Sequence, residues 1–132
     1  MKVLFVCSGN AFRSPVAEAL LRKFKPEIEG DSAGTNPVIP ISEAAREYVE
    51  KENAGEYLKK RPDDLNGKDL KRYELIVAME TRHRNAILNR CPSCGDKIAV
   101  WHIEDPYFLP PGYAEKIFEK IKQKVKELAD SM

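Results

Sequence analysis

The sequence predicts an α/β fold in which four parallel strands form one sheet with helices on both of its faces. Short runs of β-branched and aromatic residues alternate along the chain with segments whose apolar residues recur at helical spacing. The first run is apolar on both faces, as expected of a strand buried inside a parallel sheet. The chain has 132 residues, which is enough for a substantial core, so we expect a single domain over residues 1–132.

The N-terminal half should supply two strands and two helices. Residues 2–6 form the first apolar run, which stops at a Ser-Gly-Asn turn. A helix should follow this turn, with Ser14 as its N-cap and Pro15 in its first turn. The next elements are a short strand over residues 28–32 and a helix over residues 42–53.

The C-terminal half is less uniform. Residues 55–72 mix charges with glycine and proline, which indicates a loop containing a short helix near residues 67–71. The elements expected after it are a strand over 74–79, a helix over 81–89, a strand over 97–102 and a long helix over 112–129. One face of the long helix should be buried, and its members are Tyr113, Ile117, Ile121, Val125 and Leu128.

The charge balance limits the classes of partner. Lys and Arg number 22 against 21 Asp and Glu, so no overall field attracts nucleic acid or anionic lipid. We therefore expect the run Lys59-Lys60-Arg61 to be solvated rather than to form a nucleic-acid-binding patch. No apolar run is long enough for a signal sequence or a membrane span. These features predict a cytoplasmic protein without a nucleic-acid or membrane partner, present as a monomer or weak dimer.

The segment from Cys7 to Arg13 places a thiol and a guanidinium at the two ends of a strand-to-helix loop. Backbone N–H groups in such a loop converge on an anion, and the helix N-terminus adds positive potential. Arg13 can hold two phosphate oxygens, and the same field favours the thiolate of Cys7 as a nucleophile. The intervening residues, Ser8, Gly9, Asn10, Ala11 and Phe12, together with Ser14, become candidate substrate-binding residues. The alternative is a buried structural cysteine beside a surface arginine.

Asp105 is the best candidate for the acid that protonates a leaving group. It follows the fourth predicted strand, so it should lie beyond the same edge of the sheet as Cys7. Tyr107 and Phe108 then become candidate walls for an aromatic leaving group. Without that placement, Asp105-Pro106 would be an ordinary turn and the aromatic residues would be loop packing.

Three separated motifs occur in order along the chain: Val6-Cys7-x-Gly9-Asn10-x-x-Arg13-Ser14-Pro15-x-Ala17-Glu18, Ser32-Ala33-Gly34-Thr35 and Asp105-Pro106-Tyr107. With these motifs the chain resembles the low-molecular-weight protein tyrosine phosphatase family over nearly its whole length. The resemblance implies a flavodoxin-like three-layer sandwich with strand order 2-1-3-4. It also implies a phosphorylated protein as substrate and chemistry that needs no cofactor and no metal.

The resemblance also implies roles for individual residues. Cys7 would form a phosphocysteine intermediate, and Arg13 would hold the phosphoryl oxygens. Asp105 would protonate the leaving group and then activate the hydrolytic water. Ser14 would donate a hydrogen bond to the thiolate, and Asn10 would hold the loop in its strained shape.

The chain departs from the family pattern at three places. Phe12 stands where many members have a second cysteine that protects the nucleophile by forming a disulfide. Ala11 replaces a larger aliphatic residue, and members with a small polar residue there can prefer phosphoarginine. Several members support the loop with a histidine, but residues 55–62 contain none.

Cys91 and Cys94 need a separate explanation, because their Cys-x-x-Cys spacing supplies only half of a zinc site. A local disulfide or an unreactive thiol pair is favoured over a redox role with Cys7, and a metal site shared between chains is the third alternative. His83 and His102 are interpreted as solvent-exposed or packing residues.

The leading functional prediction is therefore a phosphatase that cleaves phosphotyrosine-type monoesters. Two alternatives keep the same fold, namely a protein arginine phosphatase and an arsenate reductase in which Cys91 and Cys94 accept oxidation from Cys7. An alternative from another class is a phosphate-binding module without turnover.

Overall fold

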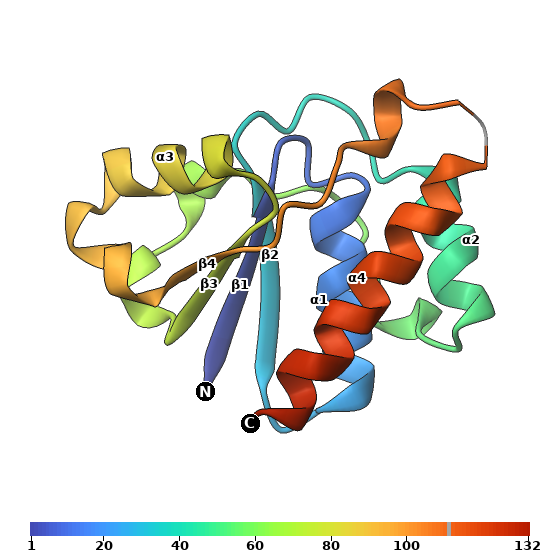
Figure 1. Ribbon diagram of the computed structural model, residues 1–132, viewed down its shortest axis with the longest axis horizontal. Coiled ribbons are helices and arrows are strands. Elements are labelled where there is room, and N and C mark those ends of the chain that lie inside the picture. The colour runs from blue at the N-terminus through green and yellow to red at the C-terminus, as the bar shows by residue number, and fades with distance from the viewer. Residues whose placement is uncertain (111) are drawn as a thin grey trace.

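The computed structural model describes residues 1–110 and 112–132. It contains one sheet of four parallel strands in the order β2-β1-β3-β4, as predicted (Figure 1). The strands are β1 (Lys2–Cys7), β2 (Glu29–Gly34), β3 (Leu75–Ala78) and β4 (Ile98–Val100). The α-helices are α1 (Arg13–Phe24), α2 (Glu43–Lys51), α3 (Thr81–Arg90) and α4 (Tyr113–Asp130).

The helices form two layers around the sheet (Figure 1). Helices α1, α2 and α4 gather on one side of the sheet, and α3 lies on the other side. Successive residues of β1 point to opposite faces, as the pleat requires. Val3, Phe5 and Cys7 belong to the apolar cluster of the first side, whereas Leu4 and Val6 belong to the cluster of the second. Each face of the central strand thus has its own core, which explains why the run is apolar on both faces.

The predicted elements were largely confirmed, and the differences are local. Residues 55–72 hold short 3₁₀ turns at Gly55–Tyr57, Leu65–Gly67 and Leu70–Arg72 instead of one short helix at 67–71. Tyr113 was wrongly placed on the buried face of α4. It is 45% exposed because it occupies the first turn of that helix. None of the described helices is long and apolar enough to cross a membrane.

Candidate active site

The loop between β1 and α1 starts and ends on buried residues. Cys7 is the last residue of β1 and is 2% exposed, and Arg13 is the first residue of α1 and is 1% exposed. Asn10, in the middle of the loop, has a φ of 52°, a left-handed conformation that asparagine tolerates better than most residues. The loop therefore turns sharply between a fixed strand end and a fixed helix start.

Gly34, at the end of β2, lets the loop pass close to the neighbouring strand. A Cβ atom on this residue would lie 2.6 Å from the backbone oxygen of Ser8 and 2.9 Å from the backbone nitrogen of Asn10. The residues that follow β2 bind the loop directly, because the N–H groups of Thr35 and Asn36 donate to the carbonyls of Cys7 and Ser8 at 3.0 and 2.8 Å. The motif Ser32-Ala33-Gly34-Thr35 thus shapes the loop from the side.

The nucleophile candidate is hydrogen-bonded from behind the loop. The Oγ atom of Ser14 lies 2.9 Å from the Sγ atom of Cys7. Asn10 Nδ2 donates to the same Ser14 Oγ at 2.7 Å, so the hydroxyl proton of Ser14 is left to donate to the sulfur. The prediction of Ser14 as an N-cap was wrong. Helix α1 begins at Arg13, and the Ser14 side chain is committed to Cys7 and Asn10 instead of to a backbone N–H.

Lys59 supports Asn10 from the opposite direction. Its Nζ atom donates to Asn10 Oδ1 at 3.0 Å, to the backbone oxygen of Ser32 at 2.8 Å and to Asp63 Oδ2 at 2.8 Å. The Lys59 side chain is only 10% exposed, so its predicted solvation was wrong. Lys59 lies at the place where the family resemblance called for a histidine, and it supplies a fixed positive charge.

Glu18 completes this buried polar group. Its Oε1 atom accepts a hydrogen bond from Ser32 Oγ at 2.6 Å and lies 3.8 Å from Lys59 Nζ. Burial raises the pKa of Glu18, although Ser32 and Lys59 oppose that effect. Ser32 Oγ also accepts from Asn10 Nδ2 at 3.0 Å, so the same network reaches the loop twice.

Arg13 is held in place and still has donors left for a ligand. Its Nη1 atom contacts Glu80 Oε2 at 2.5 Å and donates to the backbone oxygen of Ile103 at 2.7 Å. Its Nε atom is buried and has no hydrogen-bond partner among the described residues. A buried unpaired donor is costly. An anion bound in the loop would remove that cost, which fits the phosphate site predicted from the sequence.

Asp105 and Tyr107 stand on the far side of the same pocket, whose volume is about 330 Å³. Asp105 Oδ2 lies 3.7 Å from Arg13 Nη2, and Asp105 Oδ1 accepts from the Tyr107 N–H at 3.0 Å. The rings of Tyr107 and Phe12 meet edge to face with centroids 6.1 Å apart. One pocket therefore contains a thiol, a guanidinium, a carboxyl group and an aromatic wall.

The predicted site residues divide into two groups. One group lines the pocket and consists of Cys7, Ser8, Gly9, Ala11, Phe12, Arg13, Asp105 and Tyr107. The side chains of Asn10 and Ser14 are fully buried behind the loop, where they bond to each other. The side chain of Phe108 lies outside the described part of the structure. Asn36, Val38, Ile39 and Arg82 also line the pocket, and the sequence reasoning did not include them.

Helix α3 supplies three further groups that the sequence reasoning missed. Glu80, its N-cap, contacts both Arg13 and Arg82, whose Nη2 atom lies 2.9 Å from Glu80 Oε2. Burial raises the pKa of Glu80, but the hydrogen bonds from Arg13 and Arg82 outweigh it and the net pKa is lowered. His83 is 1% exposed and bonds to Ser8 Oγ through its Nε2 atom at 2.8 Å. His83 is therefore a packing residue, as predicted, and also a contact of the loop. His102 is exposed.

Cys91 and Cys94 form a disulfide, which is one of the two states that the favoured interpretation allowed. Both belong to the apolar cluster on the α3 side of the sheet, whereas Cys7 belongs to the cluster on the α1 side. The structure thus does not bring this pair together with Cys7. Across residues 1–110 and 112–132, no three His, Cys, Asp or Glu side chains are grouped to hold a metal ion.

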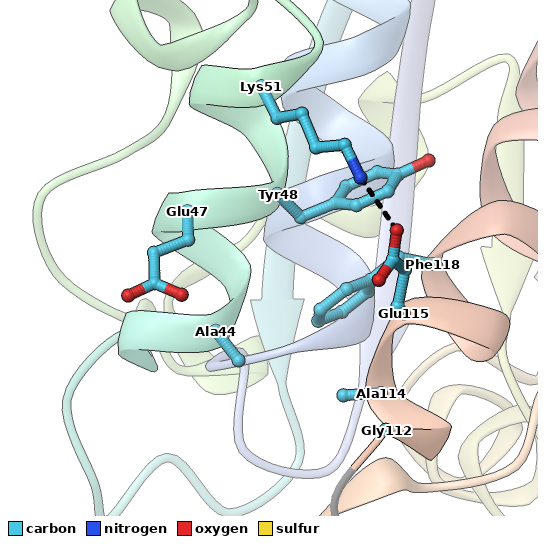
Figure 2. Close-up of a pocket in the computed structure, with 8 residues that line it drawn as sticks. All are labelled: Ala44, Glu47, Tyr48, Lys51, Gly112, Ala114, Glu115 and Phe118. Atoms are coloured by element: carbon cyan, nitrogen blue, oxygen red, sulfur yellow. Dashed lines mark hydrogen bonds and ion pairs between the residues drawn. The ribbon is translucent and has the colours of Figure 1, made fainter.

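A second pocket, of about 280 Å³, lies between α2 and α4 (Figure 2). Three charged residues line it, namely Glu47, Lys51 and Glu115, and Lys51 Nζ lies 2.7 Å from Glu115 Oε1. The Tyr48 hydroxyl donates to Glu119 Oε1 at 3.0 Å, and burial and that carboxylate raise the pKa of Tyr48. The described residues that line this pocket include no thiol and no imidazole. The loop pocket is therefore the candidate active site.

The model of the low molecular weight phosphotyrosine protein phosphatase family matches residues 2–132. The chain belongs to this family. A crystal structure of the low molecular weight protein tyrosine phosphatase from T. tengcongensis is 31% identical with a TM-score of 0.88, covering 100% of this chain and 99% of that one. The low molecular weight protein-tyrosine-phosphatase Wzb of Escherichia coli K12 is 30% identical over 119 residues, which are 80% of this chain and 77% of the relative.

Another similar solved structure is that of an arginine phosphatase. The YwlE arginine phosphatase from Geobacillus stearothermophilus is 26% identical with a TM-score of 0.85, and the match covers 98% of this chain and 91% of that one. The family membership confirms the resemblance inferred from the three motifs. The low molecular weight phosphatase fold is thus shared by proteins described as acting on tyrosine and on arginine.

Proposed function

We propose that this family member hydrolyses phosphotyrosine-type monoesters of proteins through a phosphocysteine intermediate on Cys7. The observation that carries the proposal is that Cys7, Arg13 and Asp105 line one pocket. The three groups supply the nucleophile, the oxyanion clamp and the proton donor that the reaction needs. The proposal includes a single domain that acts in the cytoplasm on a phosphorylated protein.

The reaction divides into two displacements at phosphorus. The Cys7 thiolate attacks, the P–O bond to the aryl oxygen breaks, and the carboxylic acid of Asp105 gives that oxygen its proton. Water then attacks the phosphocysteine, Asp105 takes a proton from it, and the S–P bond breaks to release inorganic phosphate and the thiolate. Arg13 would bind equatorial oxygens throughout, because its Nε donor is unpaired and buried.

The walls of the pocket favour an aryl ester over an aliphatic one. Tyr107 is 58% exposed and Val38 is 76% exposed, although both are apolar and line the pocket mouth. Together with the Phe12 ring, they can receive the ring of a phosphotyrosine. A phosphoserine has no ring to contact these residues, so they should add little to its binding.

An arginine phosphatase is the second candidate, favoured by the likeness to YwlE and by the small side chain of Ala11 at the pocket. Two arginines, Arg13 and Arg82, line the pocket, whereas Asp105 is the one carboxylate among its described lining residues. This balance disfavours a substrate that carries a guanidinium. A thiol-relay reductase has less support, because Cys91 and Cys94 pack on the other side of the sheet.

The test is steady-state hydrolysis of an aryl phosphate and of phosphotyrosine, phosphoserine and phosphoarginine peptides, with a chelator present. We expect chelator-insensitive cleavage of the tyrosine substrates by the parent protein. Cleavage should be absent in Cys7→Ser and slowed in Asp105→Asn. A preference for phosphoarginine would be compatible with the proposed mechanism but would contradict the proposed substrate. Absence of hydrolysis by the parent protein would contradict the whole proposal.

A further inference from the structure

The first turn of α3 holds the catalytic loop at two points. Glu80 and His83 form a reciprocal capping box, in which the Glu80 N–H donates to His83 Nδ1 at 3.0 Å. From this turn, the Glu80 carboxylate reaches Arg13 and the His83 ring reaches Ser8. Ser8 directly follows the nucleophile, and Arg13 is the residue at the end of the loop.

The capping box determines which nitrogen of His83 carries a proton. A backbone N–H can only donate, so His83 Nδ1 must be an acceptor in this contact. Burial, reinforced by the charge of Arg13, lowers the pKa of His83 to about 4, although Glu80 and Asp105 oppose the effect and Arg82 adds to it. The ring is therefore neutral near pH 7, and its single proton resides on Nε2.

The direction of the bond to Ser8 follows from this tautomer. His83 Nε2–H donates to Ser8 Oγ over 2.8 Å, so the serine oxygen is the acceptor. The hydroxyl proton of Ser8 must then be donated elsewhere, and Ser8 is partly exposed on the wall of the pocket that contains Cys7 and Arg13. Because Ser8 lines the same pocket as Cys7 and Arg13, an oxygen of a phosphoryl group bound there can accept this proton.

We propose that Ser8 is a substrate contact, whose hydroxyl donates a hydrogen bond to a phosphoryl oxygen, and that His83 is the positioning residue that fixes this donor. The inference rests on the proposed phosphatase function. It adds the Ser8 hydroxyl to the backbone N–H groups and the Arg13 guanidinium as a donor to the phosphoryl group. It also gives α3 a role in binding the anion at two points, through Arg13 and through Ser8.

The competing explanation is that His83 only caps α3, and a double-mutant cycle separates the two. Ser8→Ala removes the donor. His83→Asn keeps an acceptor for the Glu80 N–H but is too short to reach Ser8. Each single variant should raise the inhibition constant of inorganic phosphate and the KM for an aryl phosphate by about tenfold, with a smaller change in kcat. The combined variant should be no worse than Ser8→Ala, because His83 acts through Ser8.

Two controls are a variant that retains the hydroxyl and a measurement of folding. Ser8→Thr retains a hydroxyl and should bind phosphate nearly as the parent does. Thermal unfolding shows whether any variant is misfolded, and Ser8→Ala is the safest because this side chain is partly exposed. Unchanged phosphate inhibition in Ser8→Ala, or independent effects that multiply in the combined variant, would overturn the inference while the parent remained an active phosphatase. A parent that neither binds phosphate nor hydrolyses the aryl ester would instead overturn the proposed function.

Discussion

The two sides of the catalytic loop are supported by different chemistry. Behind the loop, a buried lysine begins a chain of hydrogen bonds that runs from Lys59 to Asn10, from Asn10 to Ser14 and from Ser14 to Cys7. In front of it, the first turn of α3 uses a carboxylate and a neutral imidazole. One support ends on the sulfur and the other on groups that face the pocket.

This difference separates nucleophile activation from anion binding. A permanent cation at the start of the buried chain polarises donors that point toward Cys7, which favours the thiolate. The α3 support acts through the carboxylate of Glu80 and the uncharged ring of His83, which orient Arg13 and Ser8. Changes on the lysine side should therefore alter reactivity, and changes on the α3 side should alter affinity for the phosphoryl group.

The largest expected effects come from the two ends of the loop. Cys7→Ser should lower kcat by about a thousandfold or more, because the nucleophile is lost, while phosphate still binds. Arg13→Ala should cause a comparable loss and should abolish phosphate binding as well. Steady-state kinetics together with phosphate titration by calorimetry check both outcomes. Equal phosphate affinity in the two variants would contradict the division of roles.

Lys59→Met should give the next largest effect. It leaves Asn10 Oδ1, the buried carboxylate of Glu18 and the half-exposed carboxylate of Asp63 without their shared cation, so the free energy of unfolding should fall by about 3 kcal/mol. The kcat/KM for an aryl phosphate should also fall, because the hydrogen-bond chain that ends on Cys7 loses its first donor. Lys60→Met is the matched control, since Lys60 is exposed and should change neither quantity. Similar behaviour of the two variants would show that Lys59 supports neither the fold nor the nucleophile.

The α3 side predicts a pH dependence of stability. The folded protein keeps His83 neutral down to a pKa of about 4, whereas the unfolded chain binds this proton near pH 6.5. The unfolded state therefore binds more protons between these values, and the free energy of unfolding should fall by about 3 kcal/mol as the pH drops from 6.5 to 4. Glu18, whose pKa is raised by burial, acts in the opposite direction over part of this range.

Denaturant unfolding of the parent and of His83→Gln at several pH values isolates the His83 contribution. The difference between the two proteins should shrink as the pH falls from 6.5 toward 4, because only the parent carries this histidine. Glu18 is common to both proteins and cancels in the difference. A difference that does not change with pH would show that His83 is not held neutral.

The smallest effect on activity should come from the disulfide. Replacing both Cys91 and Cys94 by serine should leave hydrolysis of the aryl phosphate unchanged, because the pair packs on the other side of the sheet from Cys7. The cross-link closes a very short loop, so its loss should lower the free energy of unfolding by at most about 2 kcal/mol. Loss of turnover in this variant would instead favour a thiol relay such as that of the reductase alternative.

The main parts of the site could be predicted because they follow from topology. Cys7 and Asp105 each lie in a segment that follows a predicted parallel strand, and the carboxyl ends of such strands meet at one edge of the sheet. The same rule applies to Glu80 and His83, which follow β3. The contact of His83 with the loop was missed because this residue was interpreted only as solvent-exposed or packing.

Other features could not be predicted because they depend on contacts distant in sequence. Lys59 lies in a segment without helical or strand periodicity, and its partner Asn10 is 49 residues away. Ser14 is a residue type that favours the N-cap and lies near the start of the helix, but its hydroxyl is hydrogen-bonded to the side chains of Cys7 and Asn10. Local preference fails at these positions because the site uses the residues for chemistry.

Trapping the intermediate tests most directly whether a phosphoryl group is transferred to Cys7. Asp105→Asn should be mixed with an aryl phosphate whose leaving group needs little protonation, quenched in acid and mapped by mass spectrometry. We expect a burst in which about one molecule of phenol is released per molecule of enzyme, and a phosphoryl group on the peptide that contains Cys7. Phenol release without a phosphorylated peptide, or phosphate on any other residue, would contradict it.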